Sequence, residues 1–264
     1  MKKMLALVLV ACMVLCTAVA ASAETVLEKV KAAGVLVVGT EATYGPYEFL
    51  DDDANPIGCD IWLAQQIADE LGVELKVQDM AFDGIIDAVK SGVVDIGIAA
   101  FTVSEERAKV IDFSHQYELS EQLFIVKKGN GEAYATKEAI AGLKVGAQMG
   151  TIQSQLITSA LPDSELFELD TYPNLALETV NGNIAGFVCD KAVGEGMVAQ
   201  NDNLEISGLT FSAEEASFGK ACVVAQGNED FLEIVNTVVD RVVADGSYLE
   251  AFDKYNAIWA PSAE

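Results

Sequence analysis

Apolar and polar positions alternate along the chain with two different periods, which predict strands and helices in turn. A short helix over Thr25–Ala33 ends at Gly34, and the continuously apolar run Val35–Gly39 is typical of a strand buried on both faces. The pattern continues as predicted helices over 60–71, 83–90 and 104–110 and predicted strands over 74–77 and 95–99. Strands that alternate with helices predict a largely parallel sheet.

A second series of the same kind begins with a predicted strand over Gln122–Val126. It contains predicted helices over 136–140, 151–159 and 174–180 and predicted strands over 144–147, 165–169 and 184–188. A strand over 220–224 and helices over 230–245 and 248–255 remain, and they are too few to bury a core of their own. The pattern therefore predicts two α/β lobes, with the last segment returning to the first lobe.

Two crossing segments, near Tyr117–Gln122 and Phe218–Val223, are predicted to join the lobes as a hinge. The first lobe would then comprise residues 24–118 and 220–264, and the second lobe would comprise 119–219. No fixed-period repeat and no low-complexity linker interrupts either part.

The first 23 residues have the composition of a secretory signal peptide. A basic start precedes the apolar run Met4–Leu15, and Ala21-Ser22-Ala23 offers small residues where a signal peptidase cleaves. A second interpretation is open, because Leu9-Val10-Ala11-Cys12 resembles a lipoprotein signal in which Cys12 would carry a lipid. Either one exports the protein to the periplasm or the extracellular face of the membrane. No later segment approaches the roughly 20 consecutive apolar residues of a spanning helix.

The chain is strongly acidic, with 41 Asp and Glu residues against 16 Lys and Arg residues and a formal net charge of −25. Nucleic acid is excluded as a partner, because binding it requires cations that neutralise phosphates. The excess of negative charge favours solubility and does not itself mark a site. Any group that binds an anion must therefore stand out locally.

Catalytic, metal and cofactor sites lack the residues that they need. His115 is the only histidine and has no nucleophile-elbow sequence near it, so we expect a surface or hinge side chain. Asp51, Asp53 and Asn55 resemble the start of a calcium loop, but Pro56 replaces the turn glycine, which favours a polar hairpin turn. No glycine-rich phosphate-binding motif occurs. We expect no metal, no cofactor and no catalytic residues.

Three cysteines, Cys59, Cys189 and Cys222, lie outside the predicted signal peptide. Their number is odd and their spacing matches neither a close pair nor a zinc site. We therefore expect free thiols that are buried as small apolar side chains.

One cation stands out in the segment Ala99–Arg107, where a predicted strand ends and Ser104 can cap a short helix. The planar guanidinium of Arg107 can give two parallel hydrogen bonds to one carboxylate, reinforced by unpaired amides at the helix N-terminus. From these residues alone, a surface ion pair of Arg107 with an acidic neighbour such as Glu106 is the stronger alternative.

The order of several short motifs between Val35 and Asn256 resembles that of the family 3 solute-binding proteins, the amino-acid receptors of ABC transporters. The resembling segments are Gly39–Phe49, Gly58-Cys59-Asp60, Ser91-Gly92, Thr102–Arg107, Asp112-Phe113-Ser114, Gly150-Thr151 and Asp190. The resemblance implies a type II periplasmic-binding-protein-like α/β fold, with two sheets joined by a two-crossing hinge. It also implies that hinge closure captures a polar or basic L-amino acid for delivery to the membrane permease subunits.

By this resemblance, Arg107 would bind the α-carboxylate of the ligand, assisted by the backbone and hydroxyl of Thr151 at the start of a helix. Asp190 would bind the α-ammonium group, together with the carbonyl of Ala100 and the hydroxyl of Thr102. Taken alone, Asp190 could instead be a helix N-cap.

Tyr44 and Phe82 would form aromatic walls around the ligand side chain, although either ring alone would more simply be core. Glu41 lies where some basic-amino-acid receptors carry an acid for the cationic end of the ligand, and the alternative is a solvated carboxylate at a strand end. The sequence departs from the family pattern at Ile152, where a hydroxyl residue is common. The side chain of the bound amino acid stays open.

Two other functions remain as alternatives. Some relatives on this scaffold are cyclohexadienyl-dehydratase-like enzymes, for which Lys220 or Glu41 could supply an acid or base. A solute-sensing module would bind the same ligand and signal through a protein partner. We expect a monomeric binding protein that is not an enzyme.

Overall fold

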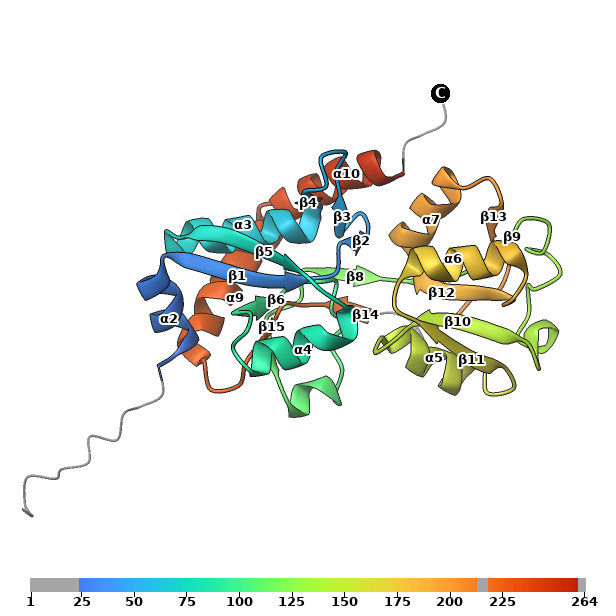
Figure 1. The fold of residues 1–264 in the computed structure, drawn as a ribbon, viewed down its shortest axis with the longest axis horizontal. Coiled ribbons are helices and arrows are strands. Elements are labelled where there is room, and N and C mark those ends of the chain that lie inside the picture. Colours follow the sequence, from blue (N-terminus) through green and yellow to red (C-terminus); the bar gives the residue numbers. More distant parts are fainter. Residues whose placement is uncertain (1–23, 213–217, 261–264) are drawn as a thin grey trace, which may run out of the picture.

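Two β-sheets with helices packed against them form two lobes that lie side by side along the long axis of the molecule (Figure 1). The computed structural model describes residues 24–212 and 218–260, so the predicted signal peptide, including Cys12, lies outside the described residues. Within these ranges no helix has both the length and the apolar character that a membrane span requires. The predicted α/β fold with two lobes and a two-crossing hinge is confirmed.

The first lobe is built on a five-stranded sheet with the order β5-β1-β6-β15-β7. Its strands are β1 (Val35–Thr40), β5 (Glu74–Asp79), β6 (Ile96–Gly97), β7 (Asp112–Phe113) and β15 (Val223–Val224). β1 pairs in parallel with β5 and β6, whereas β15 is antiparallel to β6 and β7. The apolar run of β1 is buried as its sequence predicts, because Leu36 and Val38 have no exposed surface.

Five helices surround this sheet: α2 (Val26–Ala33), α3 (Cys59–Leu71), α4 (Phe82–Lys90), α9 (Glu229–Ala244) and α10 (Ser247–Trp259). Their ends follow local sequence signals. Thr25 and Glu28 form a capping box at the start of α2, and Gly34 and Gly72 end α2 and α3 in the left-handed conformation.

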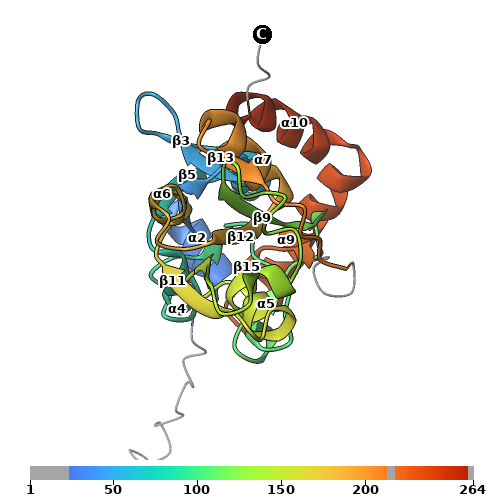
Figure 2. The same cartoon turned by 90° about the vertical axis from the view of Figure 1, so that its right-hand side faces the viewer.

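The second lobe has a five-stranded sheet with the order β11-β10-β12-β9-β13. Its strands are β9 (Gln122–Lys127), β10 (Lys144–Gln148), β11 (Glu165–Leu169), β12 (Gly186–Asp190) and β13 (Leu204–Ile206). Its α-helices are α5 (Ile152–Ala160), α6 (Tyr172–Asn181) and α7 (Lys191–Gln200). Figure 2, which faces this lobe, shows α6 and α5 on opposite sides of the sheet.

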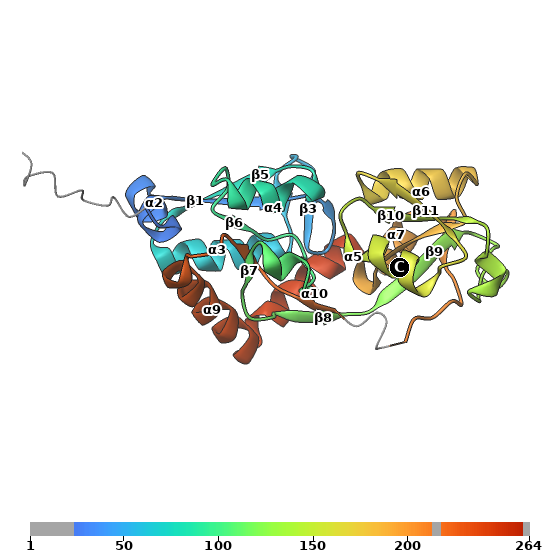
Figure 3. The same ribbon diagram turned by 90° about the horizontal axis from the view of Figure 1, so that it is seen from below.

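Two antiparallel strands connect the lobes. β8 (Glu118–Ser120) pairs with β14 (Phe218–Lys220), and β8 runs from the first lobe towards β9 of the second lobe (Figure 3). Both strands fall within the segments that the sequence assigned to the hinge. The exact lobe boundaries at 118/119 and 219/220 stay a prediction.

A small antiparallel sheet of β2 (Thr43–Tyr44), β3 (Glu48–Leu50) and β4 (Pro56–Ile57) lies at the edge of the first lobe. Between β3 and β4, Asp51 Oδ1 accepts the backbone N–H groups of Asp53 (2.9 Å) and Asn55 (2.8 Å). The segment is therefore the predicted polar hairpin turn.

Two predicted helices are wrong in type, and one helix is missing from the prediction. Segments 104–110 and 136–140 contain only the single 3-10 turns η1 (Arg107–Lys109) and η2 (Glu138–Ile140). The unpredicted helix α7 contains Gly194 and Gly196, which lower its helical propensity. Tertiary packing explains both glycines, because a Cβ at either position would overlap Ile125 or Trp259.

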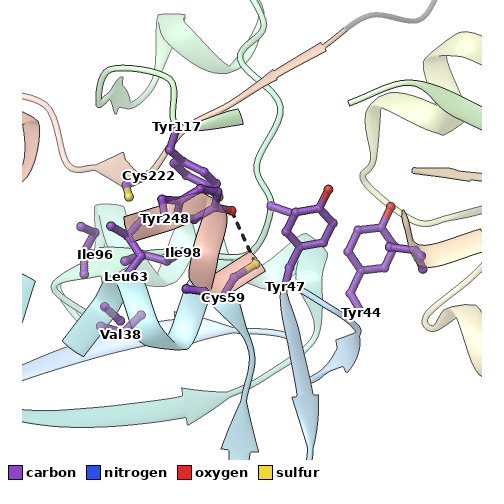
Figure 4. Packing of buried hydrophobic residues seen from close by; sticks show 14 of the residues in the cluster. Val38, Tyr44, Tyr47, Cys59, Leu63, Ile96, Ile98, Tyr117, Cys222 and Tyr248 are labelled. Carbon is purple, nitrogen blue, oxygen red and sulfur yellow. Dashed lines mark hydrogen bonds between the residues drawn. The ribbon is translucent and has the colours of Figure 1, made fainter. Parts of the chain in front are cut away.

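Buried aromatic side chains connect the core of the first lobe to the hinge (Figure 4). The rings of Tyr117 and Tyr248 lie 5.0 Å apart, and the Tyr248 hydroxyl is 3.5 Å from Cys59 Sγ. Cys59, Cys189 and Cys222 are free and buried, as the sequence predicts.

The buried carboxylate of Asp95 provides a test of the first lobe. It accepts the Val37 N–H (2.8 Å) and the Lys29 ammonium (2.7 Å) next to the central strand. Asp95→Ala leaves that amide unpaired and should lower the free energy of unfolding in urea by about 2–3 kcal/mol. Asp87→Ala, which removes an exposed partner of Lys90, should change it by less than about 0.5 kcal/mol. Equal effects of the two substitutions would contradict this role for Asp95.

Candidate ligand-binding site

A pocket lies between the lobes. Its walls contain all eight residues that the sequence proposed for ligand binding: Glu41, Tyr44, Phe82, Ala100, Thr102, Arg107, Thr151 and Asp190. Six further residues line it, namely Glu48, Ala99, Gln148, Ile152, Gln153 and Tyr172. The structure therefore brings the eight together in space, whereas their individual roles towards a ligand stay predictions.

Among the residues that the structure describes, Arg107 is the only cation in the wall of this pocket. Its guanidinium lies 5.5 Å from the ring centroid of Phe82 and 5.3 Å from that of Phe101. One of its N–H groups donates to the Thr102 carbonyl (2.9 Å) and another donates across the lobes to the Gly150 carbonyl (3.0 Å). Burial lowers the pKa of Arg107 to about 10, so the group stays charged at neutral pH. Since the side chain is only 9% exposed, the alternative of a surface ion pair is wrong.

Gly150 allows the lobes to approach each other at this point. Its φ of +76° lies in the left-handed region, and a Cβ there would come within 3.0 Å of Asp83 in the first lobe. The next residue, Thr151, caps α5 and donates its hydroxyl to the Gln148 carbonyl (2.6 Å). The hydroxyl proton of Thr151 is therefore already used within the protein.

Asp190 ends β12 on the opposite wall and is 1% exposed. Its Oδ2 accepts the Tyr44 hydroxyl (2.6 Å) and the Lys220 ammonium (2.8 Å), while Oδ1 accepts the Gln122 side-chain amide (2.7 Å). Burial alone raises the pKa of Asp190, but Lys220 and these hydrogen bonds outweigh it, so the pKa lies below its ordinary value. Asp190 occupies the N-cap position of α7, as the alternative predicted, but its carboxylate makes no capping hydrogen bond to that helix.

Glu41 is 5% exposed and lines the pocket, so the alternative of a solvated strand-end carboxylate is wrong. Its carboxylate accepts the Thr43 hydroxyl (2.6 Å) and, across the lobes, the Gln148 side-chain amide (3.1 Å). Burial raises the pKa of Glu41 against the opposing effect of these hydrogen bonds. The neighbouring acid Glu48 is also buried, and its Oε2 has no hydrogen-bond partner among the described residues.

Aromatic rings form much of the remaining wall. Tyr44 packs against Tyr172 of the second lobe at 4.7 Å and against Tyr47 at 5.9 Å, and Figure 4 shows Tyr44 at the edge of the first lobe beside the second. Phe82 stacks on Phe101 at 4.7 Å and is only partly buried, which leaves part of its surface to the pocket. Ile152 also lines the pocket, so the departure from the family pattern lies within the site.

Ala100 is held in an unusual conformation. Its φ of +47° lies in the left-handed region, which is unfavourable for a residue with a Cβ. Its N–H donates to Asp60 Oδ2 (2.7 Å) and its carbonyl accepts the Lys220 ammonium (3.4 Å). Strained residues of this kind are common where a backbone group serves a binding site.

Sequence reasoning missed the residues that orient Asp190. Lys220 and Gln122 lie outside the pocket wall, in the hinge strand β14 and at the start of β9. A lysine inside an otherwise apolar strand pattern was the available signal for Lys220. His115, by contrast, lies at the surface beside Asp240 (2.8 Å), as expected. Within residues 24–212 and 218–260, no group of His, Cys, Asp or Glu side chains has the arrangement of a metal site.

A family model described as bacterial extracellular solute-binding proteins, family 3, matches residues 36–258. The chain belongs to this family. The L-cystine-binding protein TcyJ of Escherichia coli is 32% identical over 233 residues, which cover 88% of this chain and 86% of that protein. The arginine-binding extracellular protein ArtP of Bacillus subtilis is 31% identical over 256 residues, 96% of this chain and 97% of that protein.

Solved structures of family members have the same fold. The amino-acid ABC transporter substrate-binding protein AbpA of Streptococcus pneumoniae, bound to L-arginine, matches with a TM-score of 0.85 and 30% identity over 89% of this chain and 100% of that chain. AncCDT-1, an ancestral amino-acid-binding protein and precursor of cyclohexadienyl dehydratase, matches with a TM-score of 0.78 and 28% identity. The match covers 87% of this chain and 98% of that chain. The prediction of a solute-binding protein is confirmed.

Glu118, beside the site in β8, provides a pH-dependent test. It accepts the hydroxyl groups of Tyr47 (2.9 Å) and Tyr248 (3.4 Å), and burial raises its pKa to about 7 against the opposing charge of Lys220. Between about pH 4.5 and 7 the folded state therefore holds a proton that the unfolded chain releases. The free energy of unfolding should fall over this range as pH rises, by at most about 3 kcal/mol.

Glu118→Gln removes this contribution. Its free energy of unfolding should rise relative to wild type as the pH increases from 5 to 8, as measured by urea unfolding at several pH values. Glu121→Gln changes an exposed carboxylate of the same hinge segment. Its free energy of unfolding should change with pH as that of wild type does. A constant difference between Glu118→Gln and wild type would contradict a raised pKa for Glu118.

Proposed function

We propose that this protein is the extracytoplasmic substrate-binding component of an ABC importer and that it captures a basic L-amino acid between its lobes. The observation that carries the proposal is the placement of Arg107 and Asp190, two buried groups of opposite charge, in the walls of one pocket. Burying both charges of a zwitterion is costly unless each is paired. A pocket with Arg107 and Asp190 in its walls therefore favours a ligand that carries both a carboxylate and an ammonium group.

The side-chain end of the pocket favours a cation. Glu41 lines it in a buried position, and the neighbouring Glu48 has an unpaired Oε2 that can accept a donor. A guanidinium offers several N–H donors in a plane and remains charged when buried, so it matches two acceptors better than an ammonium does. L-arginine is the first candidate, in agreement with the arginine-binding relatives, and L-cystine is the second because of TcyJ.

Ligand capture would proceed by closure of the hinge. In the open form the ligand binds to the wall of the first lobe, which holds Tyr44, Phe82, Thr102 and Arg107. The second lobe then brings Asp190 and the first turn of α5 over it, and direct bonds such as Arg107 to Gly150 close the site. The ligand shifts the population towards the closed form by its higher affinity for that form.

The catalytic alternative receives little support. Lys220, one candidate for an acid or base, does not line the pocket and is paired with Asp190. The neighbour AncCDT-1 is itself described as an amino-acid-binding protein. We therefore propose that the protein is not an enzyme, and turnover of a bound ligand would contradict this.

Partners and location follow from the same proposal. The closed protein would dock as a monomer on the permease subunits of the importer, outside the cytoplasmic membrane. Finding genes for a permease and an ATPase next to this gene would support the importer, whereas finding a sensor kinase gene there would support the sensing alternative. The mass of the mature N-terminus distinguishes a free protein that begins after Ala23 from one that is lipidated at Cys12.

A thermal-shift screen tests the ligand assignment. The mature protein, unfolded and refolded to remove co-purified ligand, is screened against the standard amino acids with ornithine, citrulline and cystine. L-arginine at a concentration of 100 Kd should stabilise the fold by about 2.7 kcal/mol. Arg107→Ala should weaken L-arginine binding by about 2–5 kcal/mol, whereas Lys109→Ala, an exposed cation nearby, should bind as wild type does. Near-wild-type affinity of Arg107→Ala would exclude its carboxylate-binding role.

Glu41→Gln tests the specificity for a cationic side chain. By calorimetry, its affinity for L-arginine should fall at least about tenfold, because a charge-assisted hydrogen bond is lost. Its affinity for citrulline, the uncharged analogue, should change much less. Glu106→Gln is a matched control, since Glu106 is exposed and outside the pocket. Equal losses for both ligands in Glu41→Gln would show that Glu41 does not recognise the cation.

A further inference from the structure

Lys220 is a fully buried cation directly behind the ligand pocket. Its side chain has no exposed surface, and its ammonium lies 2.8 Å from Asp190 Oδ2, 3.4 Å from the Ala100 carbonyl and 4.8 Å from the centroid of the Tyr47 ring. Within the described residues, no other Lys or Arg side chain is completely buried. A lysine is rarely enclosed in this way unless its charge has a specific partner.

The two oxygen acceptors of Lys220, Asp190 and the Ala100 carbonyl, are two of the groups that the family resemblance assigns to the ligand's α-ammonium. Asp190 and Ala100 both line the pocket, whereas Lys220 does not. The two acceptors therefore lie between an internal ammonium on one side and the pocket on the other. A ligand ammonium that binds them would share them with Lys220.

Asp190 has few acceptor positions left for a ligand. A carboxylate has about four lone-pair positions, and Tyr44, Lys220 and Gln122 each occupy one at 2.6–2.8 Å. Gln153 approaches Oδ2 at 3.5 Å. The charge of Asp190 is thus neutralised and its position is fixed by the protein itself, independently of any ligand.

The backbone of Lys220 ties this cation to the hinge. Lys220 pairs with Glu118 of β8, its carbonyl accepts the Tyr117 N–H (2.9 Å), and it forms a bridge with Thr102 of the pocket wall. The lysine is therefore fixed at the point where both crossing strands meet the site. If Lys220 served only to hold the hinge strands together, these backbone contacts would be sufficient and the charged ammonium group would not be needed.

We propose that Lys220 is a specificity-determining residue that neutralises Asp190 from within and so weakens the requirement for an α-ammonium group in the ligand. The inference rests on the proposed function, because it takes Asp190 as the ammonium-binding group. Without Lys220, a ligand that lacks the ammonium would leave Asp190 buried with its hydrogen bonds from Tyr44 and Gln122 but without an opposite charge. With Lys220, the same ligand leaves a satisfied ion pair.

The wild-type protein provides the first test. Its affinities for L-arginine and for the analogue of L-arginine that lacks the α-amino group are measured by calorimetry. The preference for L-arginine should be less than about thirtyfold, because a carboxylate left unpaired on ligand binding would cost more than this. A larger preference would overturn the proposal without any need for a variant.

Lys220→Met provides the second test. It removes the cation but keeps an unbranched side chain, and the preference for L-arginine over its des-amino analogue should increase at least about tenfold. Lys191→Met is the matched control, because Lys191 follows Asp190 directly but pairs with Glu195 at the surface, and its preference should equal that of wild type. An unchanged or reduced preference in Lys220→Met would show that Lys220 acts only in the structure.

Further variants separate charge from folding. Lys220→Arg keeps the cation and should retain the wild-type preference for L-arginine. If Lys220→Met does not fold, Lys220→Gln is used in its place, because it also removes the cation. If wild type does not bind L-arginine, the basic-ligand proposal fails. The affinities for L-cystine and for its analogue without α-amino groups are then compared in the same way. If neither amino acid binds, the inference fails together with the proposed function.

Discussion

The carboxylate of Asp190 is the group on which the hinge, both lobes and the pocket converge. It accepts hydrogen bonds from Tyr44 in the first lobe, from Gln122 at the start of the second lobe and from Lys220 in the returning hinge strand. A buried charge is tolerated only where it is paired and hydrogen-bonded. The position of Asp190 therefore constrains how the elements around it can be arranged.

The same constraint explains the distribution of charge around the site. The protein is acidic throughout, yet Arg107 and Lys220 are placed where carboxylates or carbonyls can satisfy them. Burial raises the pKa values of Glu41, Glu48 and Glu118, whereas Asp190, beside Lys220, stays below its ordinary value. Arg107 and Asp190 thus place opposite charges in the wall of one pocket of an otherwise acidic protein.

Polar and apolar contacts join the lobes, and Trp259 of α10 also packs against Gly196 of α7. Arg107 donates to Gly150, Glu41 accepts from Gln148, and Tyr44 packs on Tyr172. The contacts of Arg107, Glu41 and Tyr44 each involve a residue of the pocket wall or its direct neighbour. Closure and ligand recognition therefore depend on the same side chains, so that a ligand can alter the balance between open and closed forms.

The sequence by itself determined the α/β class, the two lobes and the crossing segments and, through the family resemblance, eight of the fourteen residues that line the pocket, because apolar periodicity and short motifs are local properties. It misassigned segment 104–110 and missed α7, where packing against Ile125 and Trp259 requires glycines that local propensity disfavours. Only the tertiary structure decided the environments of Glu41, Asp190 and Lys220. Burial and charge pairing depend on residues that are distant in sequence, such as Lys220 and Asp190, and these meet only when the chain returns through the hinge.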